Sequence, residues 1–247
     1  MSAKNRIREE VWRELRRVAK PDSRFHWDFS KFIPDFKGSE KCAAAIRRMK
    51  LYKNSRYIMI TPDNCLQKLR EYCILDGKTY IMPTYGIVRG FIMISRDLVP
   101  QGQEEYASTL DGADRFGISV TLQDIKALGK IDFLVTGASA VNLEGVRYGK
   151  GHGYFDLEWA MFREIGVVDE NTPVIAVVHD CQVIDIPIEA SPYDTIVDII
   201  VTPTRIINIE KKREKPKGIL WEKIPREMID EIPPLRELMK LKNLERV

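Results

Sequence analysis

Apolar residues along the chain recur with two spacings, one typical of amphipathic helices and one typical of short strands. Near the N-terminus they lie three or four positions apart, from Ile7 to Val18, and Pro21 ends this pattern. Helices are predicted over residues 4–19, 39–49 (with Ser39 as N-cap), 64–75 and 156–165, and a short helical segment follows residue 217. Strands are predicted over residues 56–61, 79–84, 87–95, 131–141, 172–179 and 195–203.

The strands over 131–141, 172–179 and 195–203 are dominated by apolar residues, as in strands covered on both faces of a parallel sheet. Their alternation with helices predicts an α/β fold in which helices cover both faces of one sheet. No internal repeat or linker divides the chain, so we expect one compact domain. The charged residues 209–217 are predicted to form a solvated turn.

Composition adds little beyond this class. Hydrophobic residues make up 44% and charged residues 30%, which indicates a soluble globular protein, and a net charge of +3 is too small to indicate nucleic-acid binding. The four cysteines form no C-x-x-C pair, and no apolar run is long enough for a membrane span or a secretory signal. We therefore expect a cytoplasmic protein whose cysteines pack as small hydrophobic residues.

The segment VRYGKGHGYFDLEWAMF, residues 146–162, is the strongest candidate for a binding site. Gly149, Gly151 and Gly153 separate an extended segment from a helix start, where backbone N–H groups and the helix dipole attract anions. Arg147 and Lys150 add positive charge, and the combination suits a polyphosphate. The alternative is a flexible surface hairpin.

The loop matches neither of the common nucleotide motifs. It lacks the G-x-x-x-x-G-K-[ST] pattern, and Tyr154 stands where the dinucleotide fingerprint needs its third glycine. Asp156 follows directly and has two interpretations, as a helix N-cap or as a ligand of Mg²⁺ beside the phosphates.

RYGKGHGYFD resembles the nucleotide-binding loop of the 5-formyltetrahydrofolate cyclo-ligase (methenyltetrahydrofolate synthetase) family. Lys4 and Arg8 in KNRIR match two cations of the family that help to bind ATP phosphates. The other similar segments are LDGKTYIMP (75–83), VVHDCQVIDIP (177–187, with Gln182 and Pro187) and YDTIVDIIVTPT (193–204). The resemblance thus covers residues 4–204 in the family's order.

This resemblance implies a three-layer α/β/α fold with a mostly parallel central sheet, as a single domain over 1–247 with residues 210–247 as a C-terminal extension packed on it. The implied reaction converts 5-formyltetrahydrofolate to 5,10-methenyltetrahydrofolate, uses ATP and Mg²⁺, and releases ADP and phosphate. Phosphorylation of the formyl oxygen turns it into a leaving group, and N10 then attacks the formyl carbon. The protein mainly positions the reactants and neutralises charge.

The resemblance also assigns roles to residues. The residues implied to hold ATP are Lys4, Arg8, Arg147, Tyr148, Gly149, Lys150, Gly151, His152, Gly153, Tyr154 and Phe155, with Arg147 and Lys150 as the catalytic cations. Asp156 and Asp194 match metal-binding aspartates, and Asp63 and Tyr154 are the expected folate contacts. The implied partner is a small-molecule reduced folate or related pterin; neither nucleic acid nor membrane is expected.

Four positions depart from the family pattern: Asp63 replaces a glutamate, Thr136 a proline, Asn142 an aspartate, and His152 a glycine or lysine. With IPDFKGS (33–39) and GYFDLEWAMF (153–162), they are similar to a cyclo-ligase-like branch that includes the methenyltetrahydrofolate synthetase domain-containing proteins of animals. The alternative function is therefore a paralogue that binds nucleotide but lacks this activity, with a role in folate- or thiamin-related metabolism.

Three further positions have competing interpretations. Trp159 is expected to pack its helix onto the sheet, with stacking on a pterin ring as the alternative. His179 and Asp180 end a predicted strand and are either pocket residues or a polar pair without a ligand. No base is arranged for Cys181, which argues against a nucleophilic cysteine.

Overall fold

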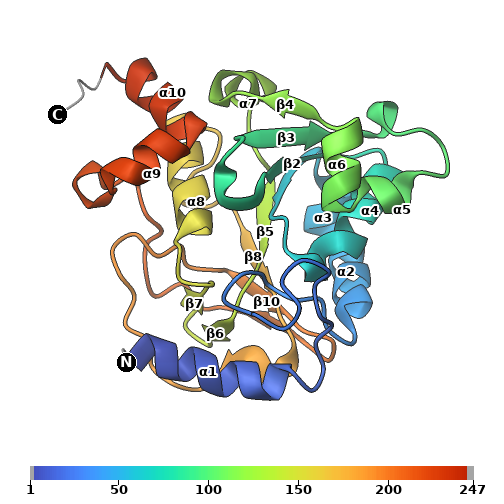
Figure 1. Cartoon of the computed structure of the whole chain (residues 1–247), viewed down its shortest axis with the longest axis vertical. Helices are drawn as coiled ribbons and strands as arrows, with labels where there is room; N and C mark the ends of the chain where they lie inside the picture. Colours follow the sequence, from blue (N-terminus) through green and yellow to red (C-terminus); the bar gives the residue numbers. More distant parts are fainter. Residues whose placement is uncertain (1–2, 244–247) are drawn as a thin grey trace.

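A computed structural model describes residues 3–243 of the chain, and the side chains from residue 6 onward (Figure 1). The strands of the main sheet are β1 Tyr57–Ile60, β2 Thr79–Pro83, β3 Phe91–Ile94, β4 Ile118–Val120, β5 Phe133–Gly137, β8 Val174–Val177, β10 Ile199–Val201 and β11 Ile206–Asn208. A smaller sheet holds β6 Ala140–Asn142, β7 Arg147–Tyr148 and β9 Val183–Ile184. The helices are α1 Ala3–Leu15, α2 Ser39–Arg48, α3 Lys50–Asn54, α4 Gln67–Leu75, α5 Glu104–Ala107, α6 Leu110–Phe116, α7 Leu122–Leu128, α8 Tyr154–Glu164, α9 Arg226–Glu231 and α10 Pro233–Leu241.

The main sheet has the strand order β11-β10-β8-β5-β1-β2-β3-β4. Its centre, from β10 to β2, is parallel, and only the outer strands β11, β3 and β4 pair antiparallel. The central strands are buried on both faces, which explains their apolar sequences. The predicted mostly parallel sheet is confirmed.

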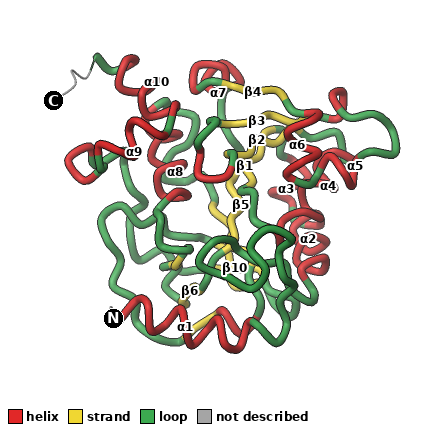
Figure 2. Tube along the Cα trace, in the orientation of Figure 1, coloured by secondary structure: helices red, strands yellow, loops and turns green. Residues whose placement is uncertain are grey.

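Side chains of successive strand residues point to opposite faces and build two separate cores. Ile58 and Ile60 join the core beneath α2 and α4, whereas Met59 between them joins the core beneath α7, α8 and α10. Figure 2 shows the helices on either side of the band of strands. The predicted three-layer α/β/α architecture is therefore confirmed.

The strand predicted over 131–141 is wrong in one respect, because the structure breaks it into β5 and β6 of different sheets. The buried Gln182 side chain causes this break, since its amide nitrogen donates to the carbonyls of Ala138 and Ser139 at 2.6 and 3.3 Å. The backbone carbonyls there bond to a side chain, while the N–H of Ser139 donates to the carbonyl of Tyr148 on β7 at 2.6 Å.

Other boundaries shift for local reasons. The predicted strand over 87–95 shortens to β3 because Gly86, Ile87 and Gly90 have positive φ angles, which extended backbone does not allow. Ser39 is not the N-cap of α2; Gly38 occupies that position, and the Ser39 hydroxyl donates to Asp35. The strands predicted over 172–179 and 195–203 are confirmed as the shorter β8 and β10.

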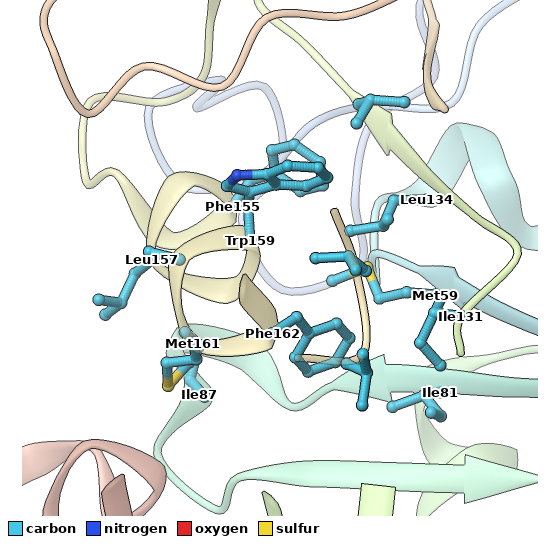
Figure 3. Packing of buried hydrophobic residues seen from close by; sticks show 14 of the residues in the cluster. Met59, Ile81, Ile87, Ile131, Leu134, Phe155, Leu157, Trp159, Met161 and Phe162 are labelled. Carbon is cyan, nitrogen blue, oxygen red and sulfur yellow. The ribbon is translucent and has the colours of Figure 1, made fainter. Parts of the chain in front are cut away.

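The C-terminal segment packs against α8 and buries it. Trp159 on α8 is fully buried, and its indole nitrogen donates to the carbonyl of Pro216 at 2.9 Å, so Trp159 packs within the fold as expected (Figure 3). Lys215 is also buried, with its ammonium 2.7 Å from the Asp198 carboxylate. The prediction of a fully solvated turn over 209–217 is therefore wrong at Lys215. The single domain over 1–247, with residues 210–247 as an extension packed on it, stays a prediction.

The described residues contain no helix that is both long and apolar enough to cross a membrane. Cys42, Cys65 and Cys73 are buried free thiols, as expected, and Cys181 is half-buried. Burial raises the pKa of the Cys42 thiol to about 12.

Arg70 on α4 is a buried cation that holds the loop after β1. Its guanidinium donates to the carbonyls of Ser108, Thr61 and Asp63 at 2.8, 2.8 and 3.0 Å. Replacing Arg70 with leucine removes these donors, and each carbonyl left buried without a partner costs about 1–3 kcal/mol. We expect Arg70→Leu to lower the free energy of unfolding, measured by chemical denaturation, by about 3 kcal/mol or more.

Lys68→Ala on the same helix is the matched control. Lys68 pairs with Glu71 at 2.8 Å but is 40% exposed, so its loss should cost no more than about 1 kcal/mol. Equal effects of the two substitutions would contradict the role assigned to Arg70.

Candidate functional site

A cavity of about 370 Å³ lies where β1, β5 and β2 end, at the carboxyl edge of the parallel sheet. Ligands of open α/β sheets bind at this edge because the loops that follow the strands converge there. The lining residues are Arg8, Ile33, Thr61, Pro62, Asp63, Thr84, Tyr85, Gly86, Thr136, Gly137, residues 147–156, Glu158, Tyr193 and Asp194. The cavity thus brings together every predicted site residue except Lys4, whose side chain lies outside the described residues.

The glycine loop connects β7 to the start of α8 on one side of this cavity. Gly151 and Gly153 have φ angles of +115° and +70°, which residues with a side chain rarely adopt. Gly153 is the N-cap of α8, so the unpaired N–H groups of the first helical turn lie at the cavity. Arg8 on α1 donates from Nε to the carbonyl of Gly149 at 2.9 Å and ties the N-terminal helix to the loop.

Arg147 is a buried cation at the base of the loop. Its side chain is 6% exposed, and its guanidinium lies 4.3 Å from the ring centroid of Phe155 and 3.4 Å from the carboxylate of Asp156. Its Nε is buried and has no hydrogen-bond partner among the described residues. A buried donor without a partner is costly, so Arg147 retains unused hydrogen-bonding capacity beside the cavity.

Asp156 is the third residue of α8 and is not the N-cap, so that interpretation is wrong. Its Oδ1 accepts from the backbone N–H of Thr195 at 2.8 Å and pairs with Arg147. Asp194 also lines the cavity, and its Oδ2 accepts from the backbone N–H of Ser191 at 2.7 Å.

Within residues 3–243 no group of three or more His, Cys, Asp or Glu side chains is arranged to hold a metal ion. Mg²⁺ often binds through one or two carboxylates, with phosphate oxygens and water completing its shell. Asp156 and Asp194 fit that mode, and their role as ligands stays a prediction.

Lys150 lies at the edge of the cavity beneath the segment around Lys31. Its ammonium donates to the carbonyl of Lys31 at 3.3 Å and lies 4.7 Å from the ring centroid of Tyr85. The Tyr85 hydroxyl donates to the same carbonyl at 2.8 Å. Burial lowers the pKa of Lys150, while the charge of Asp63 raises it. One weak neutral acceptor is easily exchanged for a phosphate oxygen.

Tyr154 and His152 form an aromatic pair at the loop. Their ring centroids are 5.4 Å apart and the rings are stacked. The Tyr154 hydroxyl lies beside Gly86, where an added Cβ would be 3.5 Å from it. Tyr154 therefore spans from the glycine loop to the loop after β2, in a position suited to contact a planar ligand.

Asp63 holds two protein groups at the opposite side of the cavity. Its Oδ2 accepts from the Thr61 hydroxyl at 2.5 Å and from the backbone N–H of Gly137 at 2.8 Å. This carboxylate links the ends of β1 and β5. Its contact with a folate stays a prediction.

Glu158 lines the same cavity, and sequence reasoning missed it. The residue is 3% exposed, its Oε2 has no hydrogen-bond partner among the described residues, and burial together with the charge of Asp63 raises its pKa well above the ordinary value. The sequence feature that could have indicated Glu158 as a site residue is its position as the single acid inside the apolar helical run LEWAMF (157–162).

His179 and Asp180 are not among the cavity's lining residues. The His179 ring caps the turn that follows β8, and the Asp180 carboxylate accepts from the hydroxyls of Thr202 and Thr204 at 2.7 and 2.6 Å. Both side chains thus bond to neighbouring protein groups, and the choice between the two interpretations stays a prediction.

The residues fit a polyphosphate such as that of ATP. Arg8, Arg147 and Lys150 supply positive charge, the glycine loop leaves room for close approach of backbone N–H groups, and Arg147 Nε lacks a partner. The fold and cavity together define an α/β protein in which a glycine loop and basic side chains line a cavity at the carboxyl edge of the sheet.

The chain belongs to the 5-formyltetrahydrofolate cyclo-ligase family, whose model matches residues 1–203. It is 37% identical over 242 residues to a methenyltetrahydrofolate synthase domain-containing protein of Bos taurus, covering 96% of this chain and 62% of that protein. The human protein of the same name is 36% identical over 241 residues, covering 96% of this chain and 61% of that protein. The chain thus spans about three fifths of the length of these relatives.

Among solved structures, the chain is similar to the 5,10-methenyltetrahydrofolate synthetase of Aquifex aeolicus. The TM-score is 0.52 at 19% identity, with 86% of this chain and 95% of that chain covered. At this identity the likeness shows the fold, which agrees with the three layers described above.

We expect Gly151→Ala to weaken the binding of inorganic tripolyphosphate about tenfold, measured by titration calorimetry. A φ angle of +115° strains an alanine by about 1–3 kcal/mol, and the loop must move to relieve it. Gly166→Ala is the matched control, since Gly166 also has a positive φ (+77°) but follows the C-terminal end of α8 with open space around it. Equal loss of affinity in both variants would mean that the loop conformation does not matter for anion binding.

Proposed function

We propose that the protein converts 5-formyltetrahydrofolate, or a related formyl-pterin, to the 5,10-methenyl form with hydrolysis of ATP to ADP and phosphate. The family match supports an enzyme of the ligase kind. One observation carries the proposal: a single cavity has basic groups with an unpaired donor at the glycine loop and the carboxyl groups of Asp63 and Glu158 elsewhere in its lining. Such a cavity suits a polyphosphate and a nitrogen-rich heterocycle bound side by side.

ATP supplies the phosphoryl group that turns the formyl oxygen into a leaving group. Arg8, Arg147 and the N–H groups of the glycine loop bind and orient the phosphates. Lys150 exchanges the Lys31 carbonyl for phosphate and neutralises charge that develops during transfer. Asp156 and Asp194 would hold Mg²⁺, whose chemistry is to neutralise phosphate charge.

The part of the site that binds the folate must orient the substrate and exclude water. Tyr154 offers an aromatic face beside the loop after β2, and the loops after β1 and β5 close the opposite side. The N10 nitrogen attacks the formyl carbon, loses its proton, and the oxygen departs with the phosphoryl group. A dry cavity protects the activated formyl group from water during this step.

One observation favours the alternative, a paralogue that binds nucleotide without this activity. The Asp63 oxygen Oδ2 is already occupied by Thr61 and Gly137, at the position where a longer acid is expected to contact folate. In that case the protein would bind ATP through the glycine loop without producing methenyltetrahydrofolate.

The test is the rise in methenyltetrahydrofolate absorbance when the protein is mixed with 5-formyltetrahydrofolate, ATP and Mg²⁺. We expect turnover in the wild type and a loss of kcat/KM of about 10²–10³-fold in Lys150→Ala, because a preorganised cation at the transferred group is removed. Asp156→Asn should lower kcat/KM similarly and should shift the Mg²⁺ requirement to higher concentration.

Lys31→Ala is the control for general charge effects. Lys31 is exposed and contributes only its backbone carbonyl to Lys150 and Tyr85, so its side chain can be removed without loss of turnover. ATP binding that depends on Lys150, without turnover in the wild type, would refute the proposed activity in favour of the paralogue.

A further inference from the structure

Glu158 is the feature of the cavity that phosphate binding does not explain. It lies on α8, one turn beyond Tyr154, and is 3% exposed. Its Oε2 is buried without a hydrogen-bond partner in the described part of the chain. A buried acceptor left unpaired costs about 1–3 kcal/mol, so a fold that keeps it gains nothing in stability.

The like charges of Asp63 and Asp156 near Glu158 disfavour an anion as its partner. Asp63 and Asp156 act on it as like charges, and Arg147 and Lys150 act as opposite charges without a direct hydrogen bond to it. Arg147 is engaged with Asp156 and the ring of Phe155, and Lys150 donates to a carbonyl. A phosphate placed against Glu158 would meet an acid with another acid nearby, whereas an N–H donor would complete its hydrogen bonding.

The position of Glu158 within the cavity also restricts the ligand. Tyr154 lies one helical turn earlier and offers an aromatic face, and Asp63 lines the cavity from the loop after β1. A planar ring that contacts Tyr154 would lie in the same cavity as these two carboxyl groups. An edge with two adjacent N–H donors pairs with a carboxyl group through two hydrogen bonds, as an amidine or guanidine does.

We infer that Glu158 is a specificity-determining residue that binds the amidine-like edge of the substrate ring, which in a pterin consists of the ring N–H and the 2-amino group. The inference rests on the proposed function for its choice of a pterin, because guanine carries the same donor edge. Glu158 would thus recognise the ring edge. Asp63 is a shorter acid whose Oδ2 already accepts from Thr61 and Gly137, so it does not supply this recognition alone.

The test compares two ligands that differ at one position of the ring. Pterin-6-carboxylate has a 2-amino donor, and lumazine-6-carboxylate has a 2-oxo acceptor in its place. We expect the wild type to bind the pterin at least about tenfold more tightly, because the 2-oxo group faces a carboxyl oxygen. In Glu158→Gln this preference should fall about tenfold or more, since the amide nitrogen of glutamine donates to the 2-oxo group. A residue with a merely structural role would not change the ratio.

The Tm of each variant, measured by thermal unfolding, shows whether a change in ligand preference results from a folding defect. Glu158→Gln and Glu158→Leu should leave the Tm unchanged or raise it, because each removes a desolvated carboxyl group that has no partner. Glu164→Gln is the matched control on the same helix. Its carboxylate accepts from the backbone N–H of Ile219 at 3.1 Å and pairs with Lys242, so this substitution should lower the Tm and leave the ligand preference as it is.

The outcomes separate this inference from the proposed function. An unchanged pterin-to-lumazine ratio in Glu158→Gln overturns the inference even where the wild type turns over 5-formyltetrahydrofolate. A Glu158-dependent ratio without turnover refutes the proposed activity and upholds the inference. Tighter binding of GTP than of ATP that depends on Glu158 would assign the donor edge to guanine and overturn the choice of a pterin.

Discussion

The burial of α8 between the sheet and the C-terminal segment is the constraint on which the site depends. Seven of the eleven residues of this helix are buried, including Trp159, whose indole nitrogen donates to Pro216. The buried Lys215, paired with the partly exposed carboxylate of Asp198, anchors the same C-terminal segment. Because the helix is covered on most sides, its first turn is fixed at the carboxyl edge of the sheet, and Glu158 is directed into the cavity. The position of the glycine loop and the burial of the Glu158 carboxyl group are thus two consequences of one packing arrangement.

The family model and the alignments with the relatives include different parts of this arrangement. The family model ends at residue 203, before the segment that covers α8. The alignments with the bovine and human proteins include 96% of this chain and therefore extend into that segment. The family model thus leaves out the segment that covers α8, whereas the alignments with the domain-containing relatives include it. The charge run 209–217 can hold a buried lysine because the Lys215 ammonium pairs with the Asp198 carboxylate and donates to the Thr172 carbonyl.

The cavity concentrates features that cost stability. Arg147 Nε and Glu158 Oε2 are two of the five buried side-chain atoms without a partner among the described residues, and both residues line it. Gly151 and Gly153 add backbone conformations that other residues rarely adopt. Groups that destabilise a fold persist where function needs them, and the proposed function would use Arg147 to bind an anion and Glu158 to bind N–H donors.

Sequence alone determined the class of fold and singled out the glycine loop that lines the cavity. Apolar strands indicate a parallel sheet, and glycines before a helix indicate a loop with room for a ligand, because both patterns are local consequences of burial and backbone freedom. It did not reveal the break between β5 and β6, the burial of Lys215 or the unpaired carboxyl group of Glu158. Each of these depends on a partner distant in the chain: Gln182 for the break, Asp198 for the lysine, and the cavity wall for the acid. Only the tertiary structure shows whether a group from a distant part of the chain lies within hydrogen-bonding distance of a buried polar atom. A buried polar atom with such a partner indicates a structural residue, and one without a partner indicates a candidate binding residue.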